Sequence, residues 1–244
     1  MRYLRLAFCG ALAVACSDES KGIDGTTIVD STPAGAHRYT TTFSRAENPI
    51  SEGGRWMNGG SGGLDWTNVS TTPGRAIGHQ SGASYTDATA ILTGTWGPDQ
   101  SASATVFATN QKDECFQEVE LRLRSQVSAH VNVGYEITYK SSQSAGAYVG
   151  IVRWNGAVGN FTRLSSNNGA QFGVKNGDVV SATIVGNVIT GYKNGVQVVQ
   201  ATDNQITTGN PGIGFNLEIG SAGCAGTNGD YGFTTFTAND TPRP

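Results

Sequence analysis

The chain has 244 residues, of which only 14% are charged, and its formal net charge is −3. A mildly acidic chain without a cluster of Lys and Arg is poorly suited to nucleic acid, because that affinity comes mainly from neutralising phosphates. No apolar run approaches the roughly 20 residues that a membrane-spanning helix needs. The 34 Gly residues, with frequent Thr, Val, Asn and Ser, favour short strands and tight turns over helices.

The first 15 residues predict an export signal, since a short basic head precedes an apolar run that ends in small residues. Ala13-Val14-Ala15-Cys16 resembles a lipobox, which implies that Cys16 is acylated and anchors the chain to the cell envelope. Ordinary cleavage that releases a secreted protein is the alternative. Residues 16–38 then form a polar tether, and Ser17 beside the lipid implies the outer membrane if the cell is Gram-negative. We expect the protein to contact the membrane only through this N-terminal lipid.

Two cysteines remain if Cys9 leaves with the signal and Cys16 carries lipid. Cys115 and Cys224 form an even pair in an oxidising compartment, which predicts a disulfide. Neither has the Cys-x-x-Cys spacing of a zinc ligand. We expect a monomer that requires no cofactor.

From about Tyr39 the sequence alternates strand-like runs with turns rich in Gly, Asn and Asp. Gly186-Asn187 and Asn194-Gly195 predict two-residue hairpin turns. Evenly spaced strands without a helical period predict an all-β, two-sheet antiparallel sandwich (a jelly roll) over residues 39–240, followed by a tail at 241–244. The expected strands are 103–109, 118–124, 134–140, 147–154, 178–185, 188–193, 196–200, 212–219 and 231–238.

Residues 43–100 are dominated by Gly-rich stretches with isolated aromatics, among them Trp56, Trp66, Tyr85 and Trp96. Such loops form ligand rims on β-sandwiches, and they also form aromatic plugs at the sandwich edge. Both interpretations stay open for this segment.

Four elements carry a resemblance to the concanavalin A-like lectin/glucanase (laminin-G-like) superfamily, over roughly residues 39–240. They are Phe43-Ser44-Arg45-Ala46, the Glu-Leu-Arg-Leu-Arg run from Glu120, Gly134-Tyr135-Glu136-Ile137 and the hairpin from Gly186 to Gly195. The chain is more weakly similar to 3-keto-glycoside hydrolase domains and to jelly-roll alginate lyases. The resemblance implies two curved sheets whose concave face holds a saccharide, often with a structural calcium on the other side.

The strand from Glu118 to Arg124 places Val119, Leu121 and Leu123 on one face and four charges on the other. Unpaired charges are too costly to bury, so Glu118, Glu120, Arg122 and Arg124 are expected to face solvent or a polar groove. Glu118 and Glu120 then lie close enough for the carboxyl pair of a retaining glycosidase. The third acid of that pattern is replaced by Arg122. The alternative is a cross-strand ladder of ion pairs.

A lyase would instead need a cation for a uronate and a base for its proton. The candidates are Arg122, Arg124 and Arg153 for the cation and Tyr135, Tyr148, Tyr192 or His79 for the base, although the Gln-x-His element of alginate lyases is missing. Tyr135 is expected in the core, and Glu136 on a polar face with Thr138 and Lys140. Glu136 also matches a site position of the keto-glycoside hydrolase pattern.

Alternation in 148–154 leaves two orientations open. With Val149 and Ile151 inside, Tyr148 and Trp154 form an aromatic platform for a sugar, and this is the arrangement we favour. If Val152 and the two aromatic side chains face the core instead, Arg153 lies in the groove. Trp66 is a further candidate for ligand contact, and Asp230, in Asn-Gly-Asp before the last strand, is a candidate calcium ligand or an ordinary turn residue.

Two functions therefore remain. The first is a surface lipoprotein that binds a polysaccharide or glycan in a concave groove, with adhesion to a protein as a variant of it. The second is a glycoside hydrolase or polysaccharide lyase that uses Glu118, Glu120, Glu136 and Arg122 in the same groove. The missing third acid favours binding.

Overall fold

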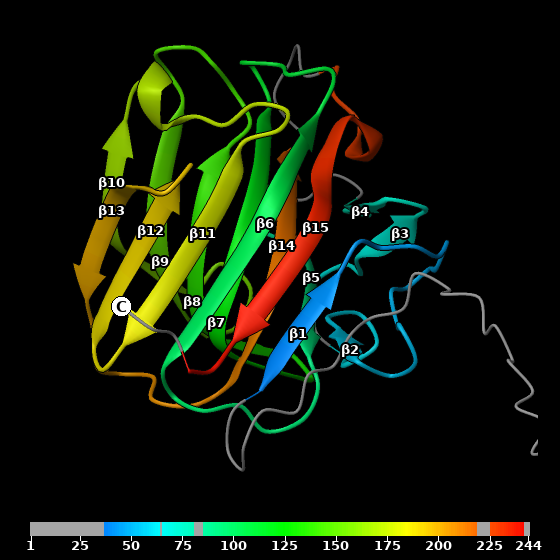
Figure 1. Ribbon diagram of the computed structural model, residues 1–244, viewed down its shortest axis with the longest axis vertical. Coiled ribbons are helices and arrows are strands. Elements are labelled where there is room, and N and C mark those ends of the chain that lie inside the picture. Colours follow the sequence, from blue (N-terminus) through cyan, green and yellow to red (C-terminus); the bar gives the residue numbers. More distant parts are fainter. Residues whose placement is uncertain (1–36, 64, 81–84, 219–224, 242–244) are drawn as a thin grey trace, which may run out of the picture.

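The computed structural model describes residues 37–63, 65–80, 85–218 and 225–241. In these ranges the strands form two antiparallel sheets that stack face to face, which confirms the predicted all-β jelly-roll sandwich (Figure 1). The predicted signal, Cys9, Cys16, nearly all of the tether, Cys224 and most of the tail lie outside the described residues. No helix in the described ranges is long and apolar enough to cross a membrane.

The first layer, here called the β6 sheet, faces the viewer in Figure 1 and has the order β13-β12-β11-β6-β15-β4-β3, with β1 paired to β15. Its strands are β1 (Arg38–Thr41), β3 (Ser70–Thr72), β4 (Arg75–Ile77), β6 (Gln100–Ala108), β11 (Val179–Val185), β12 (Val188–Lys193), β13 (Val196–Thr202) and β15 (Tyr231–Asn239).

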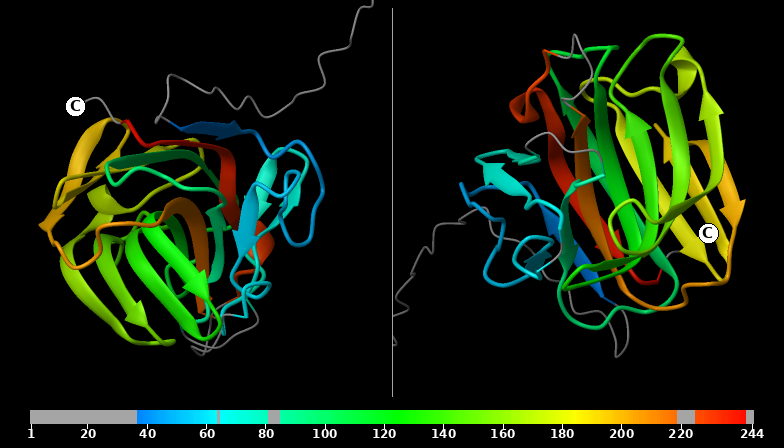
Figure 2. Two further views of the ribbon diagram at one scale, coloured as in Figure 1. Left: turned by 90° about the horizontal axis from the view of Figure 1, so that it is seen from below. Right: turned by 180° about the vertical axis from the view of Figure 1, so that it is seen from behind.

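The second layer, the β7 sheet, faces the viewer in the right-hand view of Figure 2 and has the order β10-β9-β8-β7-β14-β5-β2. Its strands are β2 (Trp56–Asn58), β5 (Ala88–Leu92), β7 (Phe116–Ser128), β8 (Val131–Lys140), β9 (Tyr148–Gly156), β10 (Phe161–Asn168) and β14 (Asn210–Glu218). Two short 3-10 helices, η1 (Ala170–Phe172) and η2 (Asn228–Asp230), complete the described secondary structure.

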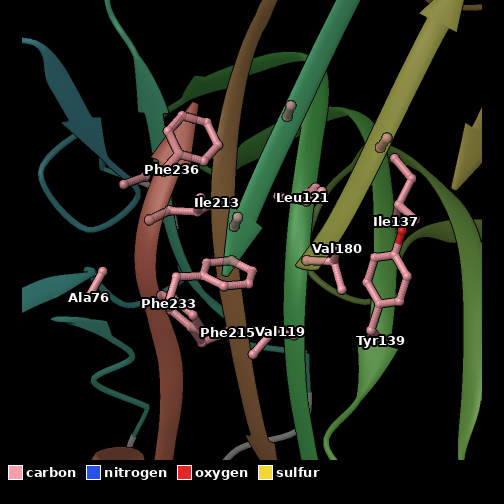
Figure 3. Close-up of a cluster of buried hydrophobic side chains, with 14 of the residues drawn as sticks. Ala76, Val119, Leu121, Ile137, Tyr139, Val180, Ile213, Phe215, Phe233 and Phe236 are labelled. Atoms are coloured by element: carbon pink, nitrogen blue, oxygen red, sulfur yellow. The ribbon is translucent and has the colours of Figure 1, made fainter. Parts of the chain in front are cut away.

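The hydrophobic core fills the space between the two layers. Val119, Leu121 and Leu123 of β7 and Tyr135 and Ile137 of β8 are fully buried there, as the alternation predicts. Figure 3 shows this packing, with side chains of β7, β8 and β14 meeting those of β11 and β15. Because every second residue of β7 and β8 faces this core, the intervening residues must point out of the other side of the sheet.

Both predicted hairpin turns are present. Gly186 has a φ of 58° between β11 and β12, and Asn194 and Gly195 have φ of 51° and 78° between β12 and β13. Positive φ at both Asn194 and Gly195, and at the first central residue Gly186 of the other turn, are the two hairpin geometries that match the right-handed twist of the paired strands.

The Gly-rich segment 43–100 contains an aromatic plug. The indole Nε1 of Trp56 donates to the hydroxyl of Tyr39 at 2.8 Å and to Glu52 at 2.9 Å, and the Trp56 ring packs on Phe236. This part of the segment therefore closes the sandwich edge.

Candidate functional site

The outer face of the β7 sheet carries the charged side chains that the sequence places on one side of β7. Glu118, Glu120 and Arg122 all point away from the core, and their neighbours in register on β8 are Lys140, Thr138 and Glu136. The predicted shared face of Glu136, Thr138 and Lys140 is thus present, with Tyr135 in the core. However, Glu120 and Arg122 are each 0% exposed, whereas the sequence predicts that they face solvent or a polar groove.

A buried ion cluster explains how these charges are accommodated. Arg122 Nη2 forms an ion pair with Glu120 and also lies 3.2 Å from Glu136 Oε2 and 3.4 Å from Asp87 Oδ2. Gly214, on the adjacent strand β14, leaves room for the cluster, because a Cβ there would lie 2.7 Å from Arg122 Nε. One guanidinium therefore contacts three carboxyl groups in a buried cluster. The exposed cross-strand ladder of ion pairs that the sequence also allowed is not formed by these residues.

Aromatic side chains cover this cluster. The Arg122 guanidinium lies 4.8 Å from the ring centre of Trp66, and Trp66 meets Trp154 edge to face at 4.4 Å. The Trp154 indole Nε1 donates a 2.6 Å hydrogen bond to Glu136 Oε2. Trp154 therefore lies on the outer face, as favoured from the sequence, but both indoles are buried against the ion cluster at 3% exposure instead of forming an open platform.

A pocket of about 160 Å³ opens beside the cluster on this face. It is lined mainly by aromatic and carboxyl side chains of β7 to β10, β14 and the segment before β5. The lining residues are Tyr85, Asp87, Phe116, Glu118, Glu136, Thr138, Tyr148, Val152, Trp154, Phe161, Arg163, Asn216 and Glu218. Glu118, Glu136, Tyr148 and Trp154 of the sequence prediction are thus brought together, whereas Glu120 lies behind the wall.

Glu118 is held from two sides. The hydroxyl of Tyr148 donates to its Oε1, and Asn216 Nδ2 donates to its Oε2 at 2.6 Å. Burial raises the pKa of Glu118, and these two hydrogen bonds offset only part of that effect. The pKa of Tyr148 is raised as well, by burial and by the negative charge of Glu118. Tyr148 therefore acts here as a hydrogen-bond donor and not as a ready base.

The other carboxyl groups of the cluster are also perturbed. Burial and then the negative charge of Glu136 raise the pKa of Asp87 and of Glu120 well above their ordinary values, although Arg122 lowers both in part. The carboxylates in turn raise the pKa of Arg122, despite its burial. The cluster therefore favours a charged arginine and shifts the titration of Asp87 and Glu120 to higher pH.

The remaining arginines of the sequence prediction lie elsewhere. Arg124 sits at a bulge of β7 with a φ of 47°, and its guanidinium donates to the carbonyls of Pro98, Ile206 and Gly186 at 2.6–3.0 Å. Arg153 forms an ion pair with Asp203 on the other side of the sheet. Neither side chain lines the pocket.

The candidate bases Tyr135, Tyr192 and His79 do not line the pocket either. Tyr135 donates to Asp203 Oδ1 at 2.7 Å, and burial, followed by this bond, raises its pKa to about 12. Cys115 is fully buried, and its predicted pairing with Cys224 stays a prediction because Cys224 lies outside the described residues.

Two places merit attention as metal sites. Asp230 Oδ2 accepts the backbone N–H of Thr227 at 2.7 Å and the amide of Asn110 at 3.2 Å, an arrangement that an ordinary helix cap explains, so its calcium role stays a prediction. Donor atoms of Asp87, Glu120 and Glu136 lie within 4.8 Å of one another. Arg122 Nη2 contacts all three of these carboxylates and so already supplies the cation between them.

Tyr85 was among the aromatics considered for a ligand rim, but several other pocket residues were not predicted from the sequence, namely Asp87, Phe116, Phe161, Arg163, Asn216 and Glu218. Asn216 and Glu218 lie in an expected strand and alternate with the core residues Phe215 and Leu217, which is a signal that could have identified them. Asp87 and Arg163 have no such signal. Each enters the site only because β5 and β10 join the same sheet as β7.

The sequence matches no protein-family model and no curated protein. Among solved structures, the carbohydrate-binding module CBM66 from Bacillus subtilis is similar with a TM-score of 0.51 at 12% identity, over 78% of this chain and 95% of the module. A native glycosidic hydrolase is similar with a TM-score of 0.50 at 14% identity, over 85% of this chain and 97% of that one. A prokaryotic β-1,3-1,4-glucanase (lichenase) derived from a mouse hindgut metagenome reaches a TM-score of 0.45 at 15% identity, over 83% and 95% of the two chains.

At these identities the likeness concerns the fold. The chain has the same two-sheet jelly-roll fold as CBM66 and the glycosidic hydrolase, and this is the fold that the sequence resemblance implied.

Proposed function

We propose that this protein binds a saccharide in the pocket on the outer face of the β7 sheet. The observation that carries the proposal is the composition of that pocket, in which aromatic rings alternate with hydrogen-bonding carboxyl and amide groups. Ligand sites commonly combine apolar walls with a few well-placed polar groups. A sugar ring needs this combination, because its C–H faces pack on aromatic side chains while its hydroxyls bond to carboxylates.

The structural neighbours support this class of ligand. CBM66 is a carbohydrate-binding module, and the second neighbour is a glycosidic hydrolase. Both have the fold of this chain, so a saccharide is the class of ligand that we test first.

Binding without chemistry is the function we favour. The retaining mechanism considered from the sequence needs Glu118 and Glu120 as an exposed pair, but Glu120 is fully buried and ion-paired with Arg122. A carboxyl group that cannot reach the ligand cannot act as nucleophile or acid.

Hydrolysis by a different pair is the second candidate. Glu118 and Glu136 both line the pocket, and the raised pKa of Glu118 suits a general acid. In this case Glu118 would protonate the leaving group and Glu136 would be the second carboxylate.

A panel of neutral, amino and uronic polysaccharides separates the two candidates. Purified protein is incubated with each polymer, and both the depletion of protein from solution and the release of reducing ends are followed. We expect depletion without new reducing ends. Release that disappears in Glu118→Gln would establish hydrolysis, and a panel that neither depletes the protein nor yields reducing ends would refute the saccharide site.

Export and anchoring by a lipid on Cys16 are the second part of the proposal, since the basic head, apolar run and lipobox-like tetrapeptide all precede the sandwich. Mass spectrometry of the protein from a membrane fraction tests it. We expect a diacylglyceryl group on Cys16 and its absence in Cys16→Ser, and a soluble chain that begins at residue 16 without lipid would contradict it.

A further inference from the structure

Most of the ionisable acidic and basic side chains that line the saccharide pocket are carboxyl groups. Asp87, Glu118, Glu136 and Glu218 line it, and Glu120 lies directly behind the wall. Carboxyl groups therefore outnumber the cationic side chains at this place, even when the buried Arg122 is included.

The cations near the pocket are largely committed to protein partners. Among the described residues that line the pocket, Arg163 is the single cation. Arg122 contacts three carboxylates, and Lys140 Nζ donates to the Asp113 carbonyl at 2.9 Å and lies over the rings of Phe116 and Tyr148. An anionic sugar such as a uronate would thus meet several carboxyl groups and one available guanidinium.

The aromatic side chains of the pocket also favour a cationic ligand. Phe161 packs on Trp154 and on Tyr85, with ring centres 5.2 Å apart in both cases. Aromatic faces attract cations through their ring quadrupoles, and carboxylates placed among such rings strengthen that attraction. The pocket thus combines the two kinds of group that recognise an ammonium ion.

A separate observation shows that the pocket floor lacks a hydrogen-bond partner. Thr138 lines the pocket and is only 6% exposed, and its Oγ1 has no partner among the described residues. A buried hydroxyl without a partner is costly. Oγ1 is itself buried, so a ligand reaches it only if the Thr138 side chain turns toward the pocket. An ammonium, which has three donors and no acceptor, can then bond to Thr138 and to a carboxylate at once.

We infer that the pocket selects a sugar unit that carries a free, protonated amine, such as glucosamine, over neutral, N-acetylated and uronic units. This inference rests on the proposed saccharide site and names the class of sugar that the site takes. N-acetylation removes the charge and adds bulk to a small pocket, and a uronate has the wrong sign of charge.

The test compares β-1,4-linked hexamers of glucosamine, glucose, N-acetylglucosamine and mannuronic acid by isothermal titration at about pH 7, where an amine of ordinary pKa is still largely protonated and carboxyl groups with raised pKa values carry more charge than in acid. We expect glucosamine to bind at least about tenfold more tightly than the other three hexamers, which corresponds to about 1.4 kcal/mol. The preference should shrink when salt is raised, because screening weakens charge recognition.

Single substitutions test whether the carboxyl groups of the pocket cause the preference for glucosamine. Glu218→Gln, at a half-buried position of the pocket, and Glu118→Gln should each reduce the ratio of glucosamine to glucose affinity. Asp65→Asn is the matched control, because it removes one negative charge at an exposed site that pairs with His130 at the far end of the β7–β8 hairpin. It should leave the ratio unchanged.

Each opposing result has a separate meaning. Equal affinity for glucosamine and glucose, or a preference for mannuronic acid, overturns the amine inference while the saccharide site stands. Failure of all four hexamers to bind also overturns it, and retention of the protein in the polysaccharide panel then shows whether the proposed function survives.

Discussion

Arg122 is the side chain on which the site depends most. It is fully buried, and it faces Glu120, Glu136 and Asp87 while Trp66 covers it. A buried ion pair gives little net stability, but removing one partner is costly because the other charges are left without compensation.

Replacing Arg122 with Met should therefore lower the free energy of unfolding by about 3–5 kcal/mol at neutral pH. The loss should be smaller in acid, because Asp87 and Glu120 then carry protons and need no cation. Urea unfolding at both pH values measures it. Arg153→Met is the control, since its partner Asp203 is closer to solvent, and a loss for Arg122→Met that does not depend on pH would contradict the assignment.

The carboxyl groups make a second prediction about pH. The pKa of Glu120 is raised in the folded protein, so the folded state retains a proton that the unfolded chain releases above its ordinary value of 4.5. This contribution to stability is complete below that value and is lost as the pH rises through the folded pKa. Glu120→Gln should thus reduce the decline in unfolding free energy between about pH 5 and pH 8.

Asp203 is expected to affect the pH dependence of the unfolding free energy in the opposite direction to Glu120. Burial raises its pKa, but hydrogen bonds from Tyr135 and the Gln205 amide, with the charge of Arg153, lower it overall. Its contribution is present above the unfolded value of 3.8 and is lost in acid, so Asp203→Asn should change stability at neutral pH and have less effect at low pH. A Glu120→Gln variant with the pH profile of the parent protein would count against the buried cluster.

The sequence pattern predicted which β7 residues share a face but not their burial. Alternation places Glu118, Glu120 and Arg122 opposite the core, as found. Their environment depends on Trp66, which comes from a Gly-rich loop, and on Asp87, which precedes a short strand. Such contacts between distant segments leave no periodic signal along the chain.

At the scale of elements, the bulge in β7 decides which residues reach the site. The pairing of β7 with β8 shifts between Leu123 and Gln126, which ends the regular alternation. Arg124 consequently leaves the row of Glu118, Glu120 and Arg122 and binds loop carbonyls instead. Strict alternation in the sequence could not reveal this interruption.

Gly134 is the position at which β8 accommodates the bulge. Its φ is 158°, and a Cβ there would lie 2.7 Å from the Cα of Ser125. Gly134→Ala should therefore lower the free energy of unfolding by about 2–3 kcal/mol, because backbone must move to admit the methyl group. Thermal unfolding measures this loss. Gly146→Ala, whose added carbon would meet only a Ser144 side-chain atom at 3.6 Å, should differ from the parent by less than about 0.5 kcal/mol.

Three strands of the β7 sheet, β2, β5 and β10, were not predicted from the sequence. β10 reads Phe-Thr-Arg-Leu-Ser-Ser-Asn-Asn, and its Ser and Asn residues suit an edge strand without the alternation of a half-buried one. β5 has five consecutive buried residues and so lacks a period of two. The strands that alternate or are joined by hairpin turns were predicted. Of the omitted strands, β10 supplies Phe161 and Arg163 to the pocket, and Asp87 immediately precedes β5.

At the scale of the whole molecule, the sandwich has two outer faces with different chemistry. The pocket on the β7 sheet is rich in aromatic and carboxyl groups. The outer face of the β6 sheet has a larger hollow, of about 690 Å³, whose lining is mainly Ser, Thr, Val and Ala with Tyr192. The fold class followed from composition, turns and alternation, whereas the choice between these faces required the structure.

The most direct test of the saccharide site compares variants of these two faces. Isothermal titration is carried out with the polysaccharide that depletes the protein in the panel, using the parent protein, Phe161→Ala in the pocket and Tyr192→Ala on the β6 sheet. We predict that Phe161→Ala weakens binding by at least about tenfold, or about 1.4 kcal/mol, and that Tyr192→Ala binds like the parent protein. Loss of binding in Tyr192→Ala with full affinity in Phe161→Ala would place the site on the wrong sheet and contradict the account.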